Sequence, residues 1–333
     1  MADAGKFPVS TRRCHFSSLG RLEKTHMSAS LTTVLLTGAS SGIGLTLAKR
    51  LAALPERYRL IATAREESFA AMRQQVCGTM VEHQVLDLLE ETACHTLMED
   101  IARRHGGVDI LINNAGISYR TVVEHLRQED EQRQMVTNFF APLLLMRLAL
   151  PHMRQRRAGR IINVSSVGGM MAMPTMGIYS ASKFALEGIS ESLWYEMRPW
   201  GVHVSLVQPG FVKSDSFRRV LLSDTAEQVM RDQSSYYNYY LHMGRFIERL
   251  MQRATTTPEK VADTVLRLME QDSPPLRVPV GIDAHFFGIL RRWLPRGAYH
   301  RLLYAFLPGI QRWGTGWREK PTASTEEAEE VTR

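Results

Sequence analysis

Apolar runs alternate with helical patterns from about residue 31 to residue 215 of the 333-residue chain. The apolar runs are short, rich in Val and Ile and bounded by glycine, which is typical of parallel strands covered on both faces. These runs are residues 32–38, 59–64, 108–116, 159–166 and 201–210. Helical patterns lie between or after them, for example at residues 43–54, 91–104 and 182–197. The alternation predicts an α/β fold with a single doubly wound parallel-sheet domain of the Rossmann type.

The regular alternation weakens after Pro209, and a clear helical pattern restarts at residues 257–270, where Thr257 is a predicted N-cap and Pro258 the first helical residue. We predict a globular domain at residues 31–284, a C-terminal helical extension at 285–318 and a disordered tail at 319–333. Residues 1–30 are basic and serine-rich. A flexible extension or a translation start at Met27 is favoured there over a transit peptide.

The net charge of +7 is concentrated in the flanks of the chain. Residues 1–30 carry five basic residues against two acidic ones, and residues 285–318 carry six arginines and no acidic residue. Because the globular part is nearly neutral, we expect no nucleic-acid partner. The extension mixes its arginines with Phe, Leu, Trp and Tyr, which suits a helix in a membrane interface. Packing against the domain or against a partner subunit is the alternative.

Cysteine and histidine usage indicates neither a disulfide framework nor a metal site. The three cysteines lack CxxC spacing, and the eleven histidines lack paired ligand spacing. We therefore predict reduced thiols, no metal and a cytoplasmic location, with peripheral contact at a membrane surface left open. No apolar run approaches the roughly 20 residues that a membrane span requires.

The segment TGASSGIG follows the first predicted strand and opens a helix, which is the context of a dinucleotide-binding turn. Gly38 permits the tight turn, and Gly42 and Gly44 allow a pyrophosphate to approach the backbone at the positive end of the helix. At the end of the second strand, Ala64 stands where an acid would bind the ribose of NAD, and Arg65 follows. We therefore predict that NADP(H) is preferred over NAD(H).

Tyr179 and Lys183 stand four residues apart in YSASK, so they share a helix face. A phenol has a pKa of about 10, which a nearby ammonium lowers toward neutrality. On its own, a tyrosine four residues before a lysine usually marks only a solvated helix face. Together with a dinucleotide turn, it predicts a proton donor and acceptor in hydride chemistry.

These motifs occur in one order, TGASSGIG, NNAG, Asn138, SS at 165–166, YSASK and PG at 209, and together they resemble the short-chain dehydrogenase/reductase family. The resemblance covers roughly residues 31–215. It implies a catalytic tetrad of Asn138, Ser166, Tyr179 and Lys183. Tyr179 would be the acid/base, Lys183 would lower its pKa, Ser166 would hold the substrate oxygen, and Asn138 would orient a water beside Lys183.

The same resemblance and motifs assign a set of cofactor-binding residues along the carboxyl ends of the strands. They are Gly38, Ser40, Ser41, Gly42, Ile43, Gly44, Arg65, Asp87, Leu88, Asn114, Ala115, Gly116, Tyr179, Lys183, Pro209, Gly210, Val212 and Ser214.

Within the family, residues 165–193 are most similar to the group containing 17β-hydroxysteroid dehydrogenase type 1 and photoreceptor-type retinol dehydrogenases. The chain departs from the usual pattern at Ser214, where a threonine is common. In this fold, residues 211–250 are expected to form a lid over the substrate. Its aromatic and methionine side chains, with the methionines at 170–176, suit a large lipophilic molecule or ordinary packing.

The leading hypothesis is an NADP(H)-dependent oxidoreductase that interconverts a lipophilic alcohol and its ketone or aldehyde, such as a steroid, retinoid or long-chain carbonyl. The alternatives are a fatty-acyl or sphingoid-base ketoreductase and a non-catalytic NADP(H)-sensing protein. The resemblance also implies a homodimer or homotetramer packed through the helices that carry Asn138 and Tyr179. The exact substrate and the working direction stay open.

Overall fold

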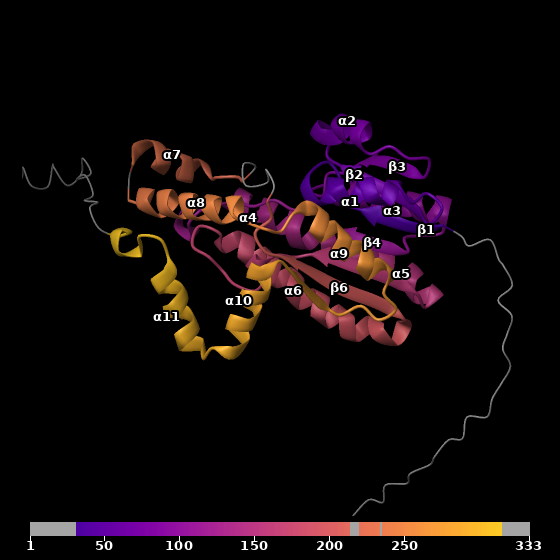
Figure 1. The fold of residues 1–333 in the computed structure, drawn as a ribbon. Helices are drawn as coiled ribbons and strands as arrows, with labels where there is room; N and C mark the ends of the chain where they lie inside the picture. The colour runs from indigo at the N-terminus through magenta and orange to yellow at the C-terminus, as the bar shows by residue number, and fades with distance from the viewer. Residues whose placement is uncertain (1–30, 214–219, 234, 315–333) are drawn as a thin grey trace, which may run out of the picture. The chain divides into compact units, whose positions relative to one another are not determined.

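The computed structural model describes residues 31–213, 220–233 and 235–314, and a seven-stranded parallel sheet forms their centre (Figure 1). The strand order is β3-β2-β1-β4-β5-β6-β7. The chain therefore reverses its direction of winding between β1 and β4, and this reversal opens a crevice at the carboxyl ends of the two strands. The strands are β1 (Thr32–Leu36), β2 (Tyr58–Ala64), β3 (Val81–Val85), β4 (Ile110–Asn113), β5 (Gly159–Val164), β6 (Val202–Pro209) and β7 (Arg277–Val280).

Helices cover both faces of the sheet because successive strand residues point to opposite sides. Val34 and Leu36 of β1 belong to one apolar cluster, and Leu35 between them belongs to the other. The first cluster includes α1 (Gly42–Ala52), α2 (Glu66–Gln75) and α9 (Pro258–Glu270). The second includes α3 (Glu91–His105), α5 (Ala141–Arg156) and α6 (Gly177–Met197), and the short α4 (Gln128–Met135) precedes α5. The doubly wound fold predicted from the sequence is confirmed.

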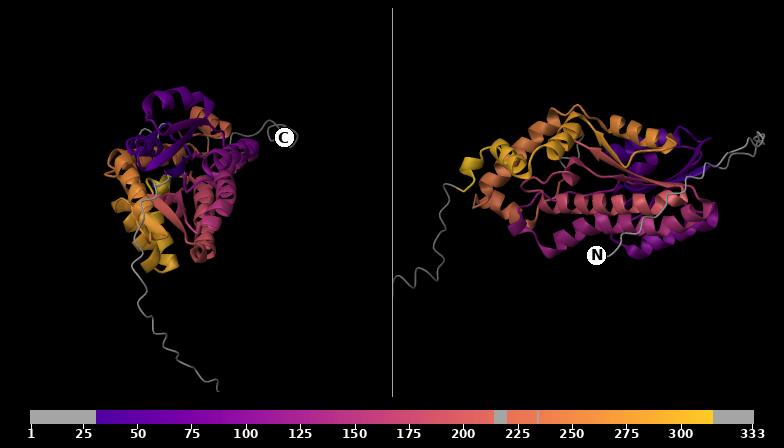
Figure 2. Two further views of the ribbon diagram at one scale, coloured as in Figure 1. Left: turned by 90° about the vertical axis from the view of Figure 1, so that its right-hand side faces the viewer. Right: turned by 90° about the horizontal axis from the view of Figure 1, so that it is seen from below.

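A helical layer lies beyond the carboxyl ends of the strands, where α7 (Asp224–Asp232) and α8 (Tyr237–Gln252) gather with α10 (Ile282–Trp293) and α11 (Arg296–Phe306) (Figure 2). Apolar contacts join these elements. Tyr299 of α11 packs with Val167 and Met171, and Trp313 packs with Met243 and Ile247 of α8. The C-terminal helices thus pack against both the loop after β5 and the helix α8.

Most of the predicted elements occur within a few residues of their expected bounds, and the Thr257 side chain caps α9 by accepting from the Lys260 N–H. Two features were not predicted. The short β7 adds a seventh strand beside β6, and the π-helical turn Val136–Phe140 precedes α5. The predicted segments 1–30 and 319–333 lie outside the described residues. Among the described residues, no helix is long and apolar enough to cross a membrane.

Candidate active site

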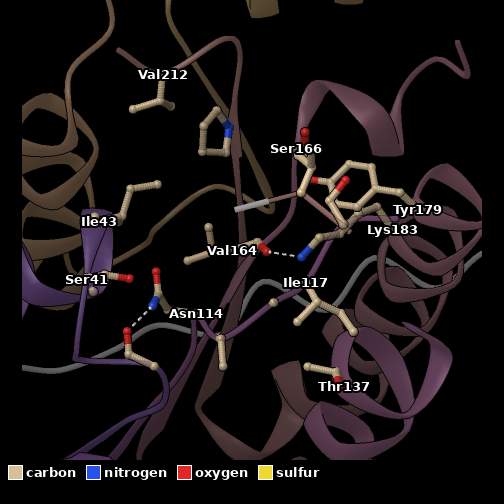
Figure 3. Close-up of a pocket in the computed structure, with 18 of the residues that line it drawn as sticks. Ser41, Ile43, Asn114, Ile117, Thr137, Val164, Ser166, Tyr179, Lys183 and Val212 are labelled. Carbon is tan, nitrogen blue, oxygen red and sulfur yellow. Dashed lines mark hydrogen bonds between the residues drawn. The ribbon is translucent and has the colours of Figure 1, made fainter. Parts of the chain in front are cut away.

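A pocket of about 860 Å³ opens at the carboxyl ends of the strands and contains most of the predicted site residues (Figure 3). Ser166, Tyr179 and Lys183 line it, as do all but one of the predicted cofactor residues. The exception, Ser214, lies outside the described residues. Asn138 is not among the lining residues, although its neighbour Thr137 is. The fold therefore brings residues from five of the six ordered motifs to one crevice, together with Arg65 and Asp87.

The turn after β1 is held by close backbone approaches that require glycine. Gly38 has φ +71°, and a Cβ there would stand 2.8 Å from the Ala115 Cα. A Cβ on Gly44 would meet the Gly38 carbonyl oxygen and lie 2.5 Å from the Asn114 Nδ2. That amide itself donates to the carbonyl oxygens of Thr37 and Gly38, at 2.9 and 3.1 Å. The Asn114 side chain thus joins the turn to the end of β4 by hydrogen bonds.

The N-terminus of α1 faces the pocket with features that suit an anion. Ser41 is the N-cap residue, and its hydroxyl makes no capping hydrogen bond. The first turn of α1 contains no acidic residue. Gly42 has φ +54°, and a Cβ there would meet nothing within 4 Å. Free backbone N–H groups at a positive helix end, with open space beside them, fit the pyrophosphate of a dinucleotide.

The ends of β2 and β3 form one side of the pocket. Arg65 is the N-cap residue of α2 and lies half exposed, with its Nη1 atom 3.8 Å from the Glu67 carboxylate. At this distance the pair is weak, so the guanidinium keeps donors for another partner. Asp87 also lines the pocket, and its Oδ1 accepts from the Leu89 N–H at 2.9 Å.

Tyr179 lies in the first turn of α6 because this helix begins at Gly177, earlier than the sequence pattern indicates. Its ring packs over Gly168, where a Cβ would stand 2.8 Å from the Tyr179 Cε1. The Ser166 hydroxyl accepts from the Gly168 N–H at 3.0 Å, which fixes its side chain beside the phenol. Figure 3 shows the Ser166 and Tyr179 side chains next to each other in the pocket wall.

Opposing influences set the pKa of Tyr179. Burial raises it above the ordinary phenol value, while a hydrogen bond with Ser166 and the charge of Arg120 oppose that rise. The Lys183 ammonium donates to the Val164 carbonyl oxygen at 2.9 Å. Burial lowers the pKa of Lys183 itself to about 8, and Glu187 opposes this shift. Tyr179 is therefore a protonated phenol at neutral pH in this state.

Glu187 connects Lys183 to the far edge of the sheet. It is buried one helical turn after Lys183, accepts from the Gln208 Nε2 at 2.9 Å and pairs with the Arg277 Nε at 2.9 Å. Arg277, on β7, also binds Glu191 at 2.8 Å. This network holds the Glu187 carboxylate one helical turn from Lys183, and its negative charge favours the ammonium form of Lys183.

Asn138 lies in the π-helical turn and is completely buried. Its Oδ1 accepts from the Ile117 N–H at 2.9 Å, and its Nδ2 donates to the Ile117 carbonyl at 3.0 Å and to the Ser182 Oγ at 3.1 Å. These bonds fix the chain after β4 against α6. That it orients a water stays a prediction.

The lid supplies fewer pocket residues than expected. Phe211, Ile247 and Met251 line the pocket, as do Met171, Met173 and Met176 from the loop before α6. The predicted aromatic residues of α8 and its N-terminus pack instead in two apolar clusters within the lid; these are Tyr236, Tyr237, Tyr239, Tyr240 and Phe246. Met170 packs toward α10 and α11, and Phe217 lies outside the described residues. Ordinary packing therefore explains most of the aromatic lid.

Comparison with known proteins identifies the family and the fold. The model of the short chain dehydrogenase family matches residues 32–223. The chain belongs to this family. It is an oxidoreductase that acts on CH–OH and C=O groups.

Three curated relatives align with this chain over most of their own length. The chain is 34% identical to a 3-ketodihydrosphingosine reductase of Bacteroides thetaiotaomicron, over 79% of this chain and 93% of that protein. It is 33% identical to human 17-beta-hydroxysteroid dehydrogenase type 1, over 74% and 76% of the two chains. It is 34% identical to human retinol dehydrogenase 8, over 75% and 82%. The resemblance to the steroid and retinol dehydrogenase group is confirmed.

Two solved structures share the fold. A metagenomic short-chain oxidoreductase in complex with NADP is 28% identical, with a TM-score of 0.59 over 76% of this chain and 98% of that one. A short-chain dehydrogenase/reductase from Burkholderia phymatum in complex with NAD has a TM-score of 0.66 at 23% identity, over 88% of this chain and all of that one. Proteins of this fold thus occur with either dinucleotide.

Sequence reasoning missed three charged residues near Tyr179 and Lys183. Glu187 had a signal, because it stands at i+4 from Lys183 within SKFALEG. Arg277 had none, since β7 brings it to Glu187 from 90 residues away. Arg120 follows NNAGISY directly, and only the fold shows that it lines the same pocket as Tyr179.

Proposed function

We propose that this protein is an NADP(H)-dependent reductase of lipophilic ketones or aldehydes. The observation that carries the proposal is the placement of Tyr179 and Ser166 in one pocket with the glycine turn and a set of methionine side chains. A protonated phenol is ready to donate to a carbonyl oxygen. The reverse reaction, alcohol oxidation, first requires the phenolate.

NADP(H) fits the residues of the nucleotide wall. The N-terminus of α1 and the glycine turn would hold the pyrophosphate, and Arg65 would bind the 2′-phosphate, because no carboxylate stands at the end of β2. When bound, the cofactor supplies the hydride. Asp87, Leu88 and the segment 114–116 would border the adenosine and ribose, and Pro209, Gly210 and Val212 would close the site from β6.

The chain's own groups would divide the remaining chemistry. Ser166 orients the substrate oxygen by a hydrogen bond, and Tyr179 gives that oxygen a proton. Lys183 holds a positive charge at the base of the pocket and donates toward the ribose, supported by Glu187. Asn138 positions the backbone of Ile117, which lines the pocket next to the reaction site.

The substrate class follows from the apolar wall. Three methionines from the loop before α6, with Ile247 and Met251 of α8, give an adaptable surface for a long or polycyclic molecule. A steroid, retinoid or long-chain carbonyl suits this wall. The 3-ketodihydrosphingosine reductase among the relatives favours a sphingoid-base ketone as the second candidate.

A substrate panel tests the proposal. NADPH and NADH consumption is measured with steroid ketones, retinals, long-chain 3-keto compounds including 3-ketodihydrosphingosine, and small aldehydes, with the Tyr179→Phe variant as the blank. We expect turnover with NADPH on large lipophilic carbonyls and little on small aldehydes. Turnover confined to small aldehydes, or tight NADPH binding without any turnover, would contradict it.

We further propose that α10 contacts a membrane surface from the cytoplasmic side. Ile282, Phe286, Ile289 and Trp293 form an exposed stripe on this helix, and Trp293 is 77% exposed. The last turn of α10 carries Arg291 and Arg292. Arg291 donates to the Met170 carbonyl oxygen, which leaves the exposed Arg292 as a cation for anionic lipid. In a co-sedimentation assay with phosphatidylserine vesicles, the double variant Phe286→Ser/Trp293→Ser should bind at most about half as much as the wild-type protein. Unchanged sedimentation of this variant would overturn the proposal.

A homodimer or homotetramer through α5 and α6 is the proposed assembly. Phe140, directly before α5, and Tyr195, near the end of α6, are 52% and 62% exposed, and an assembly interface would cover such apolar side chains. Light scattering should show a monomer when both are replaced by glutamate. A monomeric wild-type protein would end this proposal.

A further inference from the structure

Two polar residues in the pocket, Ser118 and Arg120, have no role in the reaction described so far. They follow the NNAG turn at the end of β4, and both line the pocket that contains Tyr179. Their backbone is fixed by an isolated bridge between Tyr119 and Leu221, in which the Leu221 N–H donates to the Ser118 carbonyl at 2.9 Å and the Arg120 N–H to the Leu221 carbonyl at 2.8 Å. The bridge therefore fixes the backbone that carries both side chains.

Both side chains carry a buried polar atom without a hydrogen-bond partner among the described residues: the Arg120 Nε and the Ser118 Oγ. The Arg120 Nη2 has only the Met251 thioether, at 4.0 Å. Other partly buried arginines of the chain are paired, since Arg160 donates to the Leu268 and Gln271 carbonyls and Arg277 binds two carboxylates. In the part of the chain that the structure describes, Arg120 forms no ion pair.

A guanidinium whose Nε is buried without an acceptor is costly to the fold. Burial lowers the pKa of Arg120, and its charge acts directly on Tyr179. The cation thus lies close to the place where the substrate oxygen would be protonated. Apolar side chains, Met251 and Ile247 among them, line the rest of this wall. Such a site suits a ligand that is apolar over most of its length and carries one anionic group near its reacting carbon.

We infer that Ser118 and Arg120 form a subsite for a carboxylate of the substrate, so that the preferred substrates are lipophilic oxo acids and hydroxy acids. The planar guanidinium matches both oxygens of a carboxylate, and a serine hydroxyl can donate to one of them. This inference rests on the proposed function, because it names which lipophilic carbonyl compounds the same pocket selects.

The pyrophosphate of the cofactor is the other anion to consider. The glycine turn and the N-terminus of α1 already provide a seat for it, formed by the chain between β1 and α1. Arg120 instead acts on Tyr179, the residue that contacts the substrate. Substrate rather than cofactor is therefore the partner that the geometry favours.

The test compares long-chain oxo acids with their methyl esters, which lack the negative charge and add one methyl group. The acid-to-ester ratio of kcat/KM is measured for 3-, 4-, 5- and 6-oxo chains with NADPH. In the wild type, we expect a clear preference for the acid over the ester at one of these distances between the oxo group and the carboxylate. In Arg120→Leu that ratio should fall by about 10- to 100-fold, since a charge-assisted hydrogen bond is lost. Ser118→Ala should lower it by less, and Arg120→Lys should restore part of it.

Arg133→Leu is the matched control, because Arg133 lines the same pocket but is exposed to solvent. Its acid-to-ester ratio should stay near the wild-type value. An equal fall in both variants would mean that general positive charge, and not the buried subsite, attracts the acids. An unchanged ratio in Arg120→Leu would overturn the inference.

A binding measurement separates this inference from the proposed function. Calorimetry with decanoate and decanol is performed on the NADPH-saturated protein and on Arg120→Leu. Decanoate binding that depends on Arg120 would support the subsite even if no oxo compound is turned over. Turnover of lipophilic ketones without any Arg120-dependent acid preference would keep the proposed function and reject the subsite. Weakened NADPH binding in Arg120→Leu, with the acid-to-ester ratio unchanged, would assign the guanidinium to the cofactor.

Discussion

The nucleotide wall and the substrate wall of the pocket are built in different ways. The nucleotide wall consists of turns at the ends of adjacent strands, where Gly38, Gly44 and Asn114 lock backbone to backbone. The substrate wall consists of side chains from elements far apart in the sequence, such as Met171, Phe211 and Met251. Backbone turns leave short motifs in the sequence, whereas side chains gathered by tertiary packing do not.

Electrostatics follow the same division. On the nucleotide wall, the positive end of α1 carries no acidic residue in its first turn, so its field is set by the backbone. On the substrate wall, Arg120, Lys183 and Tyr179 line the same pocket, and burial shifts the pKa of each side chain from its ordinary value. Changes on the substrate wall should therefore alter catalysis and pH dependence, and changes on the nucleotide wall should alter cofactor binding and stability.

The largest effect is expected for Tyr179→Phe. The ring that packs over Gly168 remains, but the proton that would reach the substrate oxygen is gone. We expect kcat to fall by about 10²- to 10⁴-fold, the range for loss of a general acid. NADPH binding, measured by fluorescence titration, should stay within about threefold of the wild type. A variant that retains more than a tenth of the wild-type kcat would contradict the role of Tyr179.

The next largest effect should come from Gly44→Ala on the nucleotide wall. The added Cβ meets the Gly38 carbonyl oxygen and the Asn114 amide, so the turn must open. We expect a loss of about 1–3 kcal/mol in the free energy of unfolding, measured in urea, together with weaker NADPH binding.

Gly188→Ala is the matched control for this change. Gly188 lies inside α6, where a Cβ would meet nothing within 4 Å. Alanine there should raise the free energy of unfolding by about 0.5–1 kcal/mol, because glycine is unfavourable in a helix. If both variants change stability equally, the close approach at Gly44 does not hold the turn.

The division of the pocket also explains what could be predicted from the sequence. Buried strands and the glycine turn have local signals, so the fold and the pocket position of Gly38, Arg65 and Tyr179 were accessible. The short β7 reads as Arg-Val-Pro-Val after a proline-rich loop, too short for a periodic signal. Its pairing with β6 brings Arg277 to Glu187, and only the sheet order reveals that contact.

The substrate wall was misjudged for a related reason. Aromatic residues in the lid suggested a pocket lining, but Tyr240 hydrogen-bonds to His125 at 2.9 Å and packs inside the lid. Amino-acid composition shows that a segment is aromatic or apolar, but it does not show which way its side chains point. Arg120 shows the converse, since nothing in its local sequence marks it as a residue of the reaction site.

A moderate effect is expected for Arg65→Ala. Loss of the guanidinium at the end of β2 should raise the KM for NADPH by about tenfold, as for other charge-assisted hydrogen bonds, and leave the KM for NADH within about twofold. Initial rates with each cofactor provide the measurement. Glu67→Gln is the comparison, because it removes the carboxylate 3.8 Å from Arg65 and should slightly lower the KM for NADPH. Equal changes for NADPH and NADH in Arg65→Ala would reject the NADP(H) preference.

The smallest effect is a shift in pH dependence in Glu187→Gln. Burial lowers the pKa of Lys183 to about 8, and the Glu187 carboxylate opposes this by stabilising the ammonium. Removing that charge should lower the pKa of Lys183 further, so the ammonium is lost at a lower pH. The alkaline limb of kcat/KM for carbonyl reduction, which reports the free enzyme, should move to lower pH by less than about one unit.

The control for this shift is Glu191→Gln. Glu191 binds Arg277 in an exposed pair, and this variant leaves the Glu187 carboxylate in place beside Lys183. Its alkaline limb should coincide with that of the wild type. A limb that moves equally in both variants would show that the packing of Arg277, rather than the charge of Glu187, sets the ionisation of Lys183. If the alkaline limb of kcat/KM does not move in Glu187→Gln, a group other than Lys183 titrates in that pH range, and Tyr179 is the first candidate. The electrostatics of the two walls would then differ less than the structure indicates.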